Sequence, residues 1–437
     1  MKFLTASLVS TLLASVASAG PISVRRSPSN QTQTQSGSEN QGDGKAMSAA
    51  NGTSVGAAFF ISNEPDGNLL IAADIGTDGK LTLRRAVDTG GLGAHGVTDP
   101  NGPDPLFSQG AIKASATGNI VATVNAGSNT LSVFKINPTD PTAVSMIGRP
   151  VGSGGEFPVS LAINSAGNTV CALNGGSVNG VSCFKVDQQK GLVPIANTVR
   201  SLKLNQTTPA TGPAGSASHV VFTEDNKQLV ASVKGIPPQP GFLAVWDIGN
   251  DGSLSTDFQS IAPEKGGLLP FSMTIIPGQN AILATDAGLG FDIFAFANSS
   301  KNVNGTDSPK SSAVAIDGQA ATCWSSFSPK TKNFYLTDIG TSIITEINIS
   351  DSLKGTIVKQ YQQGHGSGTI DNDIATVDNK DIMYVLSANA TAIDVLSLDA
   401  PGQARNIQKL DIASPAKAAG VKINANNLQG MTTFIRK

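Results

Sequence analysis

The stretch Val121-Ala122-Thr123-Val124-Asn125, which a Gly-containing turn joins to a second β-prone run starting at Thr130, decides the fold because it recurs along the chain. Each copy ends in Asn, Asp or Lys; the seven copies occupy residues 59–63, 121–125, 170–174, 230–234, 282–286, 334–338 and 384–389. A mean spacing of about 54 residues with several strands per unit indicates a β-propeller, because a single four-stranded blade cannot bury both of its faces. We therefore predict an all-β, seven-bladed propeller.

The two ends of this repeat region predict how the ring closes. Six copies are preceded by another strand-like run, but the first has no such run upstream, and a matching run occurs at residues 428–435 near the C-terminus. We expect this last strand to complete the first blade, which would leave no unpaired edge between first and last blades.

The N-terminal residues read as export and spacer segments. An apolar run at residues 3–16 followed by Ala17-Ser18-Ala19 is typical of a signal peptide, so we assign 1–19 to it. Residues 20–26 end in the dibasic pair Arg25-Arg26 and are assigned to a short propeptide, with a simple basic spacer as the alternative. Residues 27–52, rich in Ser, Gln, Asn and Gly, are assigned to a flexible stalk, and 53–437 to the propeller.

Composition excludes several classes of protein. Of the 437 residues, 39% are hydrophobic and 14% charged, and 30 Lys and Arg stand against 32 Asp and Glu. This is a globular composition without the basic excess of a nucleic-acid binder. No run beyond the leader reaches the ~18 apolar residues that cross a bilayer. We expect a secreted or cell-wall-associated monomer, N-glycosylated at its seven sequons, Asn30, Asn51, Asn205, Asn298, Asn304, Asn348 and Asn389.

Three cysteines are too few for a disulfide scaffold. Cys171 and Cys183 lie in two strand-like runs, each six residues from Ser177, which places them opposite each other across a hairpin. We predict a disulfide between them, with two free buried thiols as the alternative, and a free Cys323.

The candidate ligand-binding residues are those at the starts of the innermost strands, which line the central channel of a propeller. They form a polar but almost uncharged set: Gln109, Ser160, Ser218, Phe271, Ser272, Trp324, Asp373 and Gln429. Phe271 and Trp324 would form an apolar wall there, or pack between blades. We expect a small-molecule, glycan or protein ligand at this mouth, no cofactor, and no metal, since the three histidines lack a metal-binding spacing.

Four segments of this region carry a family resemblance. DPLFSQG at 104–110, NAGSNTLS at 125–132, FPVS at 157–160 and AATCW at 320–324 together resemble the lactonase-type seven-bladed propellers, which include 3-carboxymuconate cyclases and 6-phosphogluconolactonases. The resemblance covers about residues 57–437. Secreted fungal members are often described as surface or secreted glycoprotein antigens, so it implies an extracellular antigen- or adhesin-type protein.

The resemblance also implies a catalytic set. Catalytic members carry a His at one inner strand, an Arg after a Pro on the next inner strand, and a Glu after the strand that follows. His219 matches the first position, Phe271 stands where the Arg would be, and Asp286 stands near the Glu position. His219 and Asp286 are therefore the catalytic candidates, with ligand binding or a structural hydrogen bond as alternatives for His219.

The charge of the channel separates two hypotheses. A carboxymuconate or sugar phosphate needs Arg or Lys partners, because an unpaired buried charge costs several kcal/mol. No arginine occurs at an inner-strand start, and whether Lys113 or Lys234 faces the channel is not fixed by strand alternation. We favour a secreted binding glycoprotein with a depleted catalytic set. The alternative is a lactone-forming or lactone-hydrolysing enzyme.

Overall fold

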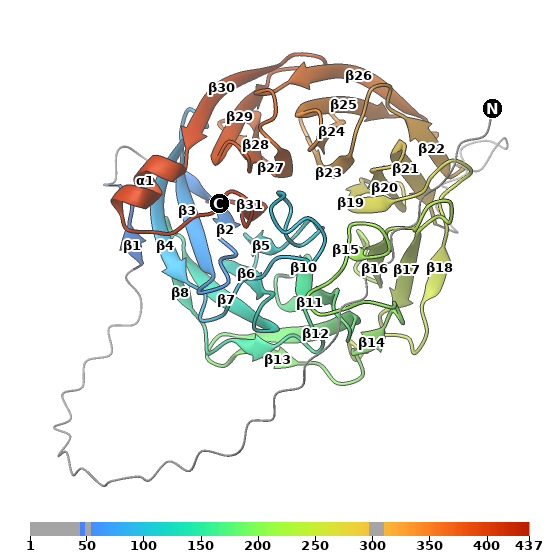
Figure 1. The fold of residues 1–437 in the computed structure, drawn as a ribbon, viewed down its shortest axis with the longest axis horizontal. Helices are drawn as coiled ribbons and strands as arrows, with labels where there is room; N and C mark the ends of the chain where they lie inside the picture. Colours follow the sequence, from blue (N-terminus) through green and yellow to red (C-terminus); the bar gives the residue numbers. More distant parts are fainter. Residues whose placement is uncertain (1–43, 49–53, 297–309, 437) are drawn as a thin grey trace, which may run out of the picture. The chain divides into compact units, whose positions relative to one another are not determined.

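A ring of seven antiparallel sheets forms the body of the protein (Figure 1). The computed structural model describes residues 44–48, 54–296 and 310–436. In these residues each sheet, or blade, contains four main strands, which follow chain order in six blades, and three blades carry a short fifth strand. The fold predicted from the repeat is confirmed.

The strands occupy equivalent positions in blades 1 to 7, which are numbered in ring order. The innermost are β31 (Gln429–Ile435), β5 (Ile112–Ser115), β10 (Pro158–Ile163), β15 (Ala217–Phe222), β19 (Pro270–Ile276), β23 (Thr322–Phe327) and β27 (Thr369–Val377). The second are β2 (Ser54–Ile61), β6 (Ile120–Asn125), β11 (Thr169–Asn174), β16 (Gln228–Val233), β20 (Ala281–Asp286), β24 (Asn333–Asp338) and β28 (Lys380–Ser387). The third are β3 (Leu69–Gly76), β7 (Thr130–Asn137), β12 (Gly180–Asp187), β17 (Phe242–Asp247), β21 (Gly290–Ala295), β25 (Ile343–Ile349) and β29 (Ala392–Leu398). The outermost are β4 (Leu81–Asp88), β8 (Asp140–Met146), β13 (Gly191–Pro194), β18 (Gln259–Ile261), β22 (Ser312–Ala315), β26 (Gly355–Gln362) and β30 (Ala404–Asp411).

Blade 1 closes the ring as the sequence predicts. Strand β31, from the C-terminal end, pairs antiparallel with β2, with Gly56 opposite Ile435. It therefore supplies the innermost strand of the first blade.

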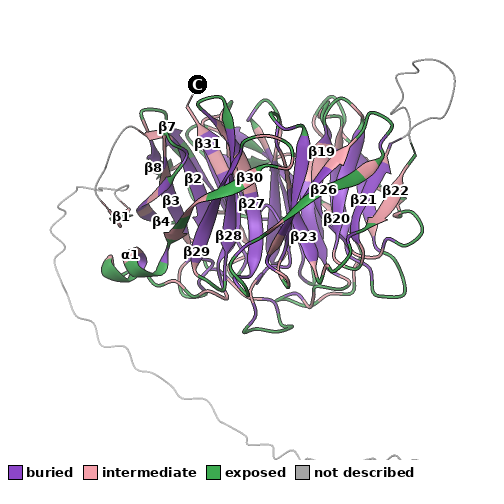
Figure 2. Ribbon diagram, turned by 90° about the horizontal axis from the view of Figure 1, so that it is seen from above, coloured by how far each residue is buried: buried purple, intermediate pink, exposed green. Residues whose placement is uncertain are grey.

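The core lies between blades and around the second strands. All six residues of β6, β20 and β24 are buried, whereas six of the eight residues of the outermost strand β26 are exposed (Figure 2). Each fully buried Val, Leu, Ile or Phe contributes about 1.5–3 kcal/mol to folding. The repeat signal and the core thus coincide, because the repeated stretches are the second strands.

The N-terminal boundary of the ring differs from the prediction. Lys45–Ala46, which composition places in the stalk, forms strand β1 on the outer edge of blade 1, paired with Arg85 and Ala86 of β4. The Met47 amide and the Ser48 carbonyl also hydrogen-bond to Arg84. The exposed edge of β4 offers backbone partners that do not depend on side-chain hydrophobicity, so polar residues can pair there. The segments predicted to be a signal peptide and a propeptide, and the rest of the predicted stalk, lie outside the described residues.

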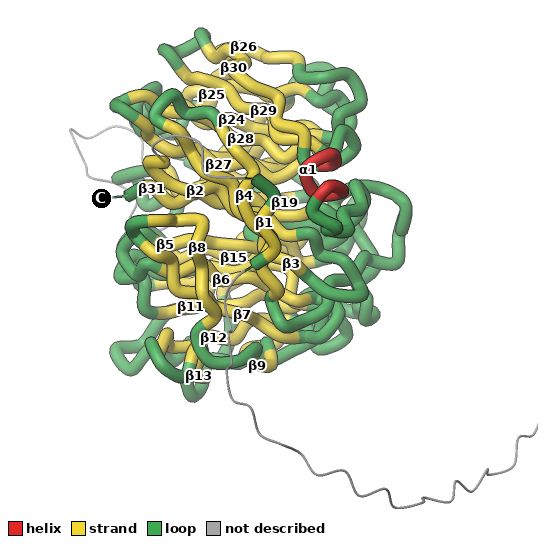
Figure 3. The backbone as a smooth tube through the Cα atoms, turned by 90° about the vertical axis from the view of Figure 1, so that its left-hand side faces the viewer, coloured by secondary structure: helices red, strands yellow, loops and turns green. Residues whose placement is uncertain are grey.

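Two short strands and one helix complete the described part. Strands β9 (Val151–Gly152) and β14 (Arg200–Ser201) pair with β7 and β12, and α1 (Ala413–Ala418) follows blade 7 (Figure 3). No helix among the described residues is long and apolar enough to cross a membrane.

Cys171 on β11 and Cys183 on β12 stand directly opposite each other and form a disulfide, while Cys323 is free and buried. Of the sequons, Asn205 and Asn389 are exposed, and Asn348 is half-buried, with its side-chain amide donating to Asn333. Asn30, Asn51, Asn298 and Asn304 lie outside the described residues.

Candidate functional site

The central channel carries few charges on its own strands. Lys113 is the single Lys or Arg of the seven innermost strands, and Asp371 and Asp373 on β27 are their carboxylates. Lys113 is half-buried, and its positive charge acts on Asp371, Asp373 and His219. Lys113 therefore lies within electrostatic range of the other three side chains.

Residues 104–110, which we call the plug, run into the middle of the ring at the end where the innermost strands begin. In Figure 1 this part of the chain is the cyan segment between β4 and β5. The plug belongs to no strand, and Asp104, Phe107 and Gly110 have left-handed backbones with φ of 64°, 54° and 88°. These conformations turn the chain sharply within a short distance.

Side chains of the plug reach the opposite side of the ring. The Gln109 amide donates through Nε2 to the Ser325 carbonyl (2.9 Å) and accepts from the Ser325 N–H (3.1 Å). The Ser108 carbonyl accepts from Trp324 Nε1 and Gln429 Nε2, both at 2.9 Å. Blades 2 and 6 are as far apart as two blades of a seven-membered ring can be, so the plug spans the channel.

The plug is also bound by blades 3 and 4. Ser160 Oγ donates to the Gln109 carbonyl (2.7 Å), and the Gln109 N–H donates to the Ser218 carbonyl (3.1 Å). Ser108 Oγ donates to the Val159 carbonyl at 2.8 Å. The polar groups at the strand starts thus bind a segment of the same chain.

Lys234 holds the plug with a buried ammonium group. It follows β16, is 2% exposed, and donates from Nζ to the Phe107 carbonyl at 2.7 Å. The Nζ also lies 4.4 Å from the centre of the Phe271 ring, a cation–π contact. Burial lowers the pKa of Lys234, because the charged form loses its hydration.

Two buried carboxyl groups face this lysine region. Burial raises the pKa of Asp104, and the negative charge of Asp371 raises it further, while Lys234 opposes both effects. Burial raises the pKa of Asp371 to about 6, although its Oδ2 accepts from Gln429 Nε2 (2.7 Å) and the Gly430 N–H (2.9 Å). Asp371 Oδ1 is buried and makes no hydrogen bond among the described residues.

His219 lies beside the end of the plug. Its Nδ1 accepts from the Met273 N–H at 2.9 Å, so the neutral ring carries its hydrogen on Nε2. That Nε2 is buried and has no partner among the described residues, and a Cβ added to Gly110 would lie 3.1 Å from it. Burial and the charge of Lys113 hold the pKa of His219 well below its usual range. In this state His219 offers a hydrogen-bond donor rather than a base.

Asp286, the second catalytic candidate, binds backbone in its own blade. Its Oδ2 accepts from the N–H groups of Leu268 (2.6 Å) and Leu269 (3.0 Å), and its Oδ1 accepts from Gly288 (2.8 Å). Asp338 makes the same set of contacts in blade 6. No hydrogen bond joins Asp286 to His219 among the residues described, and the partner of His219 Nδ1 is the Met273 amide.

The remaining ligand-binding candidates also have protein partners. Phe271 and Trp324 are fully buried and pack edge to face, with ring centres 5.1 Å apart. Ser218 Oγ pairs with Ser232, Ser272 Oγ pairs with Thr285 and Ser325, and Asp373 Oδ2 accepts from Thr433. The structure therefore brings the candidate residues together around the channel, but none presents a free apolar wall.

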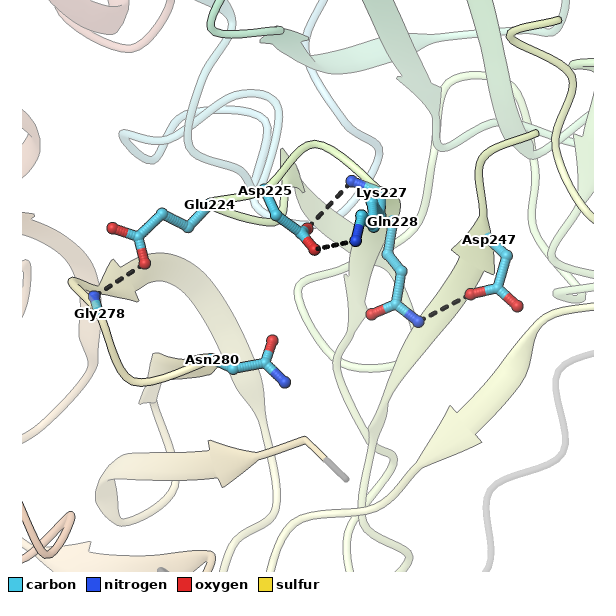
Figure 4. Close-up of a pocket in the computed structure, with 7 residues that line it drawn as sticks. All are labelled: Glu224, Asp225, Lys227, Gln228, Asp247, Gly278 and Asn280. Carbon is cyan, nitrogen blue, oxygen red and sulfur yellow. Dashed lines mark hydrogen bonds and ion pairs between the residues drawn. The ribbon is translucent and has the colours of Figure 1, made fainter. Parts of the chain in front are cut away.

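A separate groove lies on the rim between blades 4 and 5, away from the plug. It has a volume of about 700 Å³ and only polar side chains around it: Glu224, Asp225, Lys227, Gln228 and Asp247, with Gly278 and Asn280 (Figure 4). Glu224 accepts from the Gly278 N–H (2.8 Å), and Gln228 donates to Asp247 (2.8 Å). Its side chains are largely exposed, which distinguishes it from the buried cluster at the plug.

Sequence reasoning missed Asp104 and Asp371 and left the orientation of Lys113 and Lys234 open. Lys234 is the single Lys among the repeat ends, where other blades have Asn or Asp, and this exception was the available signal. Asp371 precedes Asp373 by two residues, so strand alternation could have placed both on one face. Asp104 lies in an irregular segment and gave no pattern.

Comparisons with known proteins agree with this geometry. A family model described as "Lactonase, 7-bladed beta-propeller" matches residues 59–208. No curated protein sequence is significantly similar to the chain.

Solved structures share the ring at low sequence identity. A periplasmic gluconolactonase of Pseudomonas aeruginosa is 12% identical, with a TM-score of 0.59 over 87% of this chain and 99% of that chain. A proposed 6-phosphogluconolactonase of Bacteroides fragilis is 14% identical, with a TM-score of 0.57 over 88% of this chain and all of that chain. Residues 59–208 are thus similar to the lactonase-type seven-bladed propellers in sequence, and the ring shares its fold with these solved structures.

Proposed function

We propose that this protein is a secreted, glycosylated binding propeller that holds a neutral hydroxylated small molecule in its channel and does not turn over carboxylated or phosphorylated lactones. The observation that carries the proposal is the pair of unpartnered buried atoms beside Gly110, the His219 Nε2–H donor and the Asp371 Oδ1 acceptor. Hydroxyl groups of a ligand can satisfy each of these atoms, since a hydroxyl accepts from an N–H and donates to a carboxylate.

The balance of charge supports a neutral ligand. Asp371 and Asp373 oppose Lys113 at the channel, and Lys234 is already bound to the plug. An anionic substrate would meet more carboxylates than free cations. Because an unpaired buried charge is costly, this arrangement disfavours a phosphate or a tricarboxylate.

The proposed export and glycosylation are supported by the sequence and by one disulfide bond. The leader at residues 1–19 and the exposed sequons Asn205 and Asn389 agree with a secreted glycoprotein. The Cys171–Cys183 disulfide is typical of an oxidising compartment. Sequencing the N-terminus of the exported protein, with and without deglycosylation, tests this part.

The ligand is tested by titration calorimetry with neutral monosaccharides and glucono-1,5-lactone against 6-phosphogluconate and a carboxymuconate. We expect saturable binding of a neutral compound and no turnover of the anionic lactones. His219→Phe, which removes the Nε2–H donor, and Asp371→Asn, which removes the charge of the acceptor, should each weaken that binding about tenfold. Hydrolysis of 6-phosphogluconolactone above the spontaneous rate would contradict the proposal.

A second function, hydrolysis of a neutral lactone, is favoured by the pKa of Asp371. A carboxylate with a pKa of about 6 and a free oxygen can take a proton from water near neutral pH, and the His219 N–H can stabilise the oxyanion. Turnover would then rise with pH through about 6 and disappear in Asp371→Asn. In this function Asp371 acts as the base, and the catalytic candidate His219 acts as the hydrogen-bond donor.

A further inference from the structure

The plug has the construction of a movable cover. Blade 2 is complete without it, because β5 starts at Ile112 and pairs with β6 from that residue onward. Left-handed residues stand at both ends of the plug, Asp104 and Gly110, where a change of backbone angles would swing the segment. Moving it therefore breaks contacts between blades but leaves every blade's ladder intact.

The groups beneath the plug favour its release. Lys234 and Asp104 are buried ionisable groups with no salt bridge between them, and His219 Nε2 and Asp371 Oδ1 have no hydrogen-bond partner among the described residues. Each would gain hydration if the plug left the channel. This gain offsets the hydrogen bonds that the movement breaks, so the closed and open arrangements lie closer in free energy than burial alone implies.

We propose that residues 104–110 form a lid that opens locally, without unfolding of the ring, and that Lys234 is its latch. The latch contact is the hydrogen bond from Lys234 Nζ to the Phe107 carbonyl. Opening gives a ligand access to His219 and Asp371 from the end of the channel where the innermost strands begin. The identity of that ligand rests on the proposed function, but the movement of the lid does not.

Cys323 is a native reporter of this movement. It is the one free cysteine of the sequence, is 5% exposed, and adjoins Trp324, whose Nε1 donates to the plug. Burial raises the pKa of its thiol, and the charges of Asp104 and Lys234 act on it. A thiol reagent therefore reaches Cys323 only after the plug has moved or the ring has unfolded.

The test is the rate at which 5,5′-dithiobis(2-nitrobenzoate) labels Cys323 without ligand or reductant, measured across low concentrations of urea. A local opening gives a rate independent of urea, whereas unfolding gives a rate that rises with urea from the start. We expect a urea-independent rate in the wild type and a rate at least tenfold higher in Lys234→Met. Gln109→Ala, which removes both contacts with Ser325, should also accelerate labelling and serves if Lys234→Met does not fold.

Val245→Ala is the matched control, because it opens a cavity in blade 4 without a contact to the plug. It should lower global stability and leave the urea-independent rate unchanged. The lid proposal is contradicted if the labelling rate of wild-type Cys323 rises with urea concentration over the whole range. It is also contradicted if both plug variants are labelled at the wild-type rate. Either result would leave the binding proposal standing, since calorimetry tests it separately.

Discussion

Blades 4 and 6 use the same repeat position for different purposes. In blade 6 Asp338, the last residue of β24, accepts from the N–H groups of Ala320 (2.7 Å), Ala321 (3.1 Å) and Gly340 (2.9 Å) of its own blade. In blade 4 Lys234 stands at the corresponding place and binds the plug instead. Blades 5 and 6 make the same backbone contacts at this position, so the departure in blade 4 marks a region with a separate role.

Deleting residues 428–437 is expected to have the largest effect on stability, since it removes both the contacts of a strand within its blade and a contact with the plug. Strand β31 completes blade 1, and its Gln429 donates to the plug at the Ser108 carbonyl. Loss of an entire innermost strand exceeds the ~5–15 kcal/mol by which a protein is normally stable. The truncated chain should lack a cooperative thermal transition, and retention of one near the wild-type temperature would show that the ring closes elsewhere.

Asp338→Ala and Lys234→Met separate the two roles. Asp338→Ala leaves several backbone N–H groups without partners and should lower the free energy of unfolding by about 2–4 kcal/mol. Lys234→Met also removes a buried charge, so its cost to global stability should stay within about 1 kcal/mol.

Urea unfolding of both variants measures this difference. A larger loss of the free energy of unfolding in Lys234→Met than in Asp338→Ala would mean that the hydrogen bond of Lys234 stabilises the whole ring. It would contradict the difference in role between blades 4 and 6.

Asp292→Asn extends the comparison to blade 5. It is expected to raise the free energy of unfolding, by less than Asp338→Ala lowers it. Asp292 faces Asp286 in blade 5, where blade 6 has Thr345, and burial raises its pKa to about 9, with the charge of Asp286 adding to the rise. A carboxyl group whose pKa is higher in the folded state stabilises the fold below about pH 4, and this contribution is lost as pH rises toward 9.

The variant should therefore be more stable than the wild type by about 1–3 kcal/mol at pH 8, with the difference shrinking toward pH 4. Thermal unfolding at both pH values measures it. An equal difference at the two pH values would show that Asp292 keeps no proton in the folded protein.

The sequence was sufficient for the ring, its closure and the hairpin of Cys171 and Cys183, because those depend on local periodicity and on strand order. Ser160 and Gln429 lie on innermost strands as the sequence predicts, whereas Gln109 lies in the plug. The sequence did not show that they bind one another, since the contacts join segments more than 50 residues apart through an irregular loop. From the sequence alone, polar residues at a channel mouth are interpreted as ligand-binding groups, because the segment of the same chain that binds them cannot be identified.

The most direct test of the plug is the nuclear Overhauser spectrum of the Trp324 indole. The Nε1 atom lies 2.9 Å from the Ser108 carbonyl oxygen across the channel, and the protein has only one other tryptophan, Trp246. The account predicts a slowly exchanging Trp324 indole proton with cross-peaks to Ser108 and Gln109. Fast exchange of that proton with no cross-peak to residues 104–110 would contradict it.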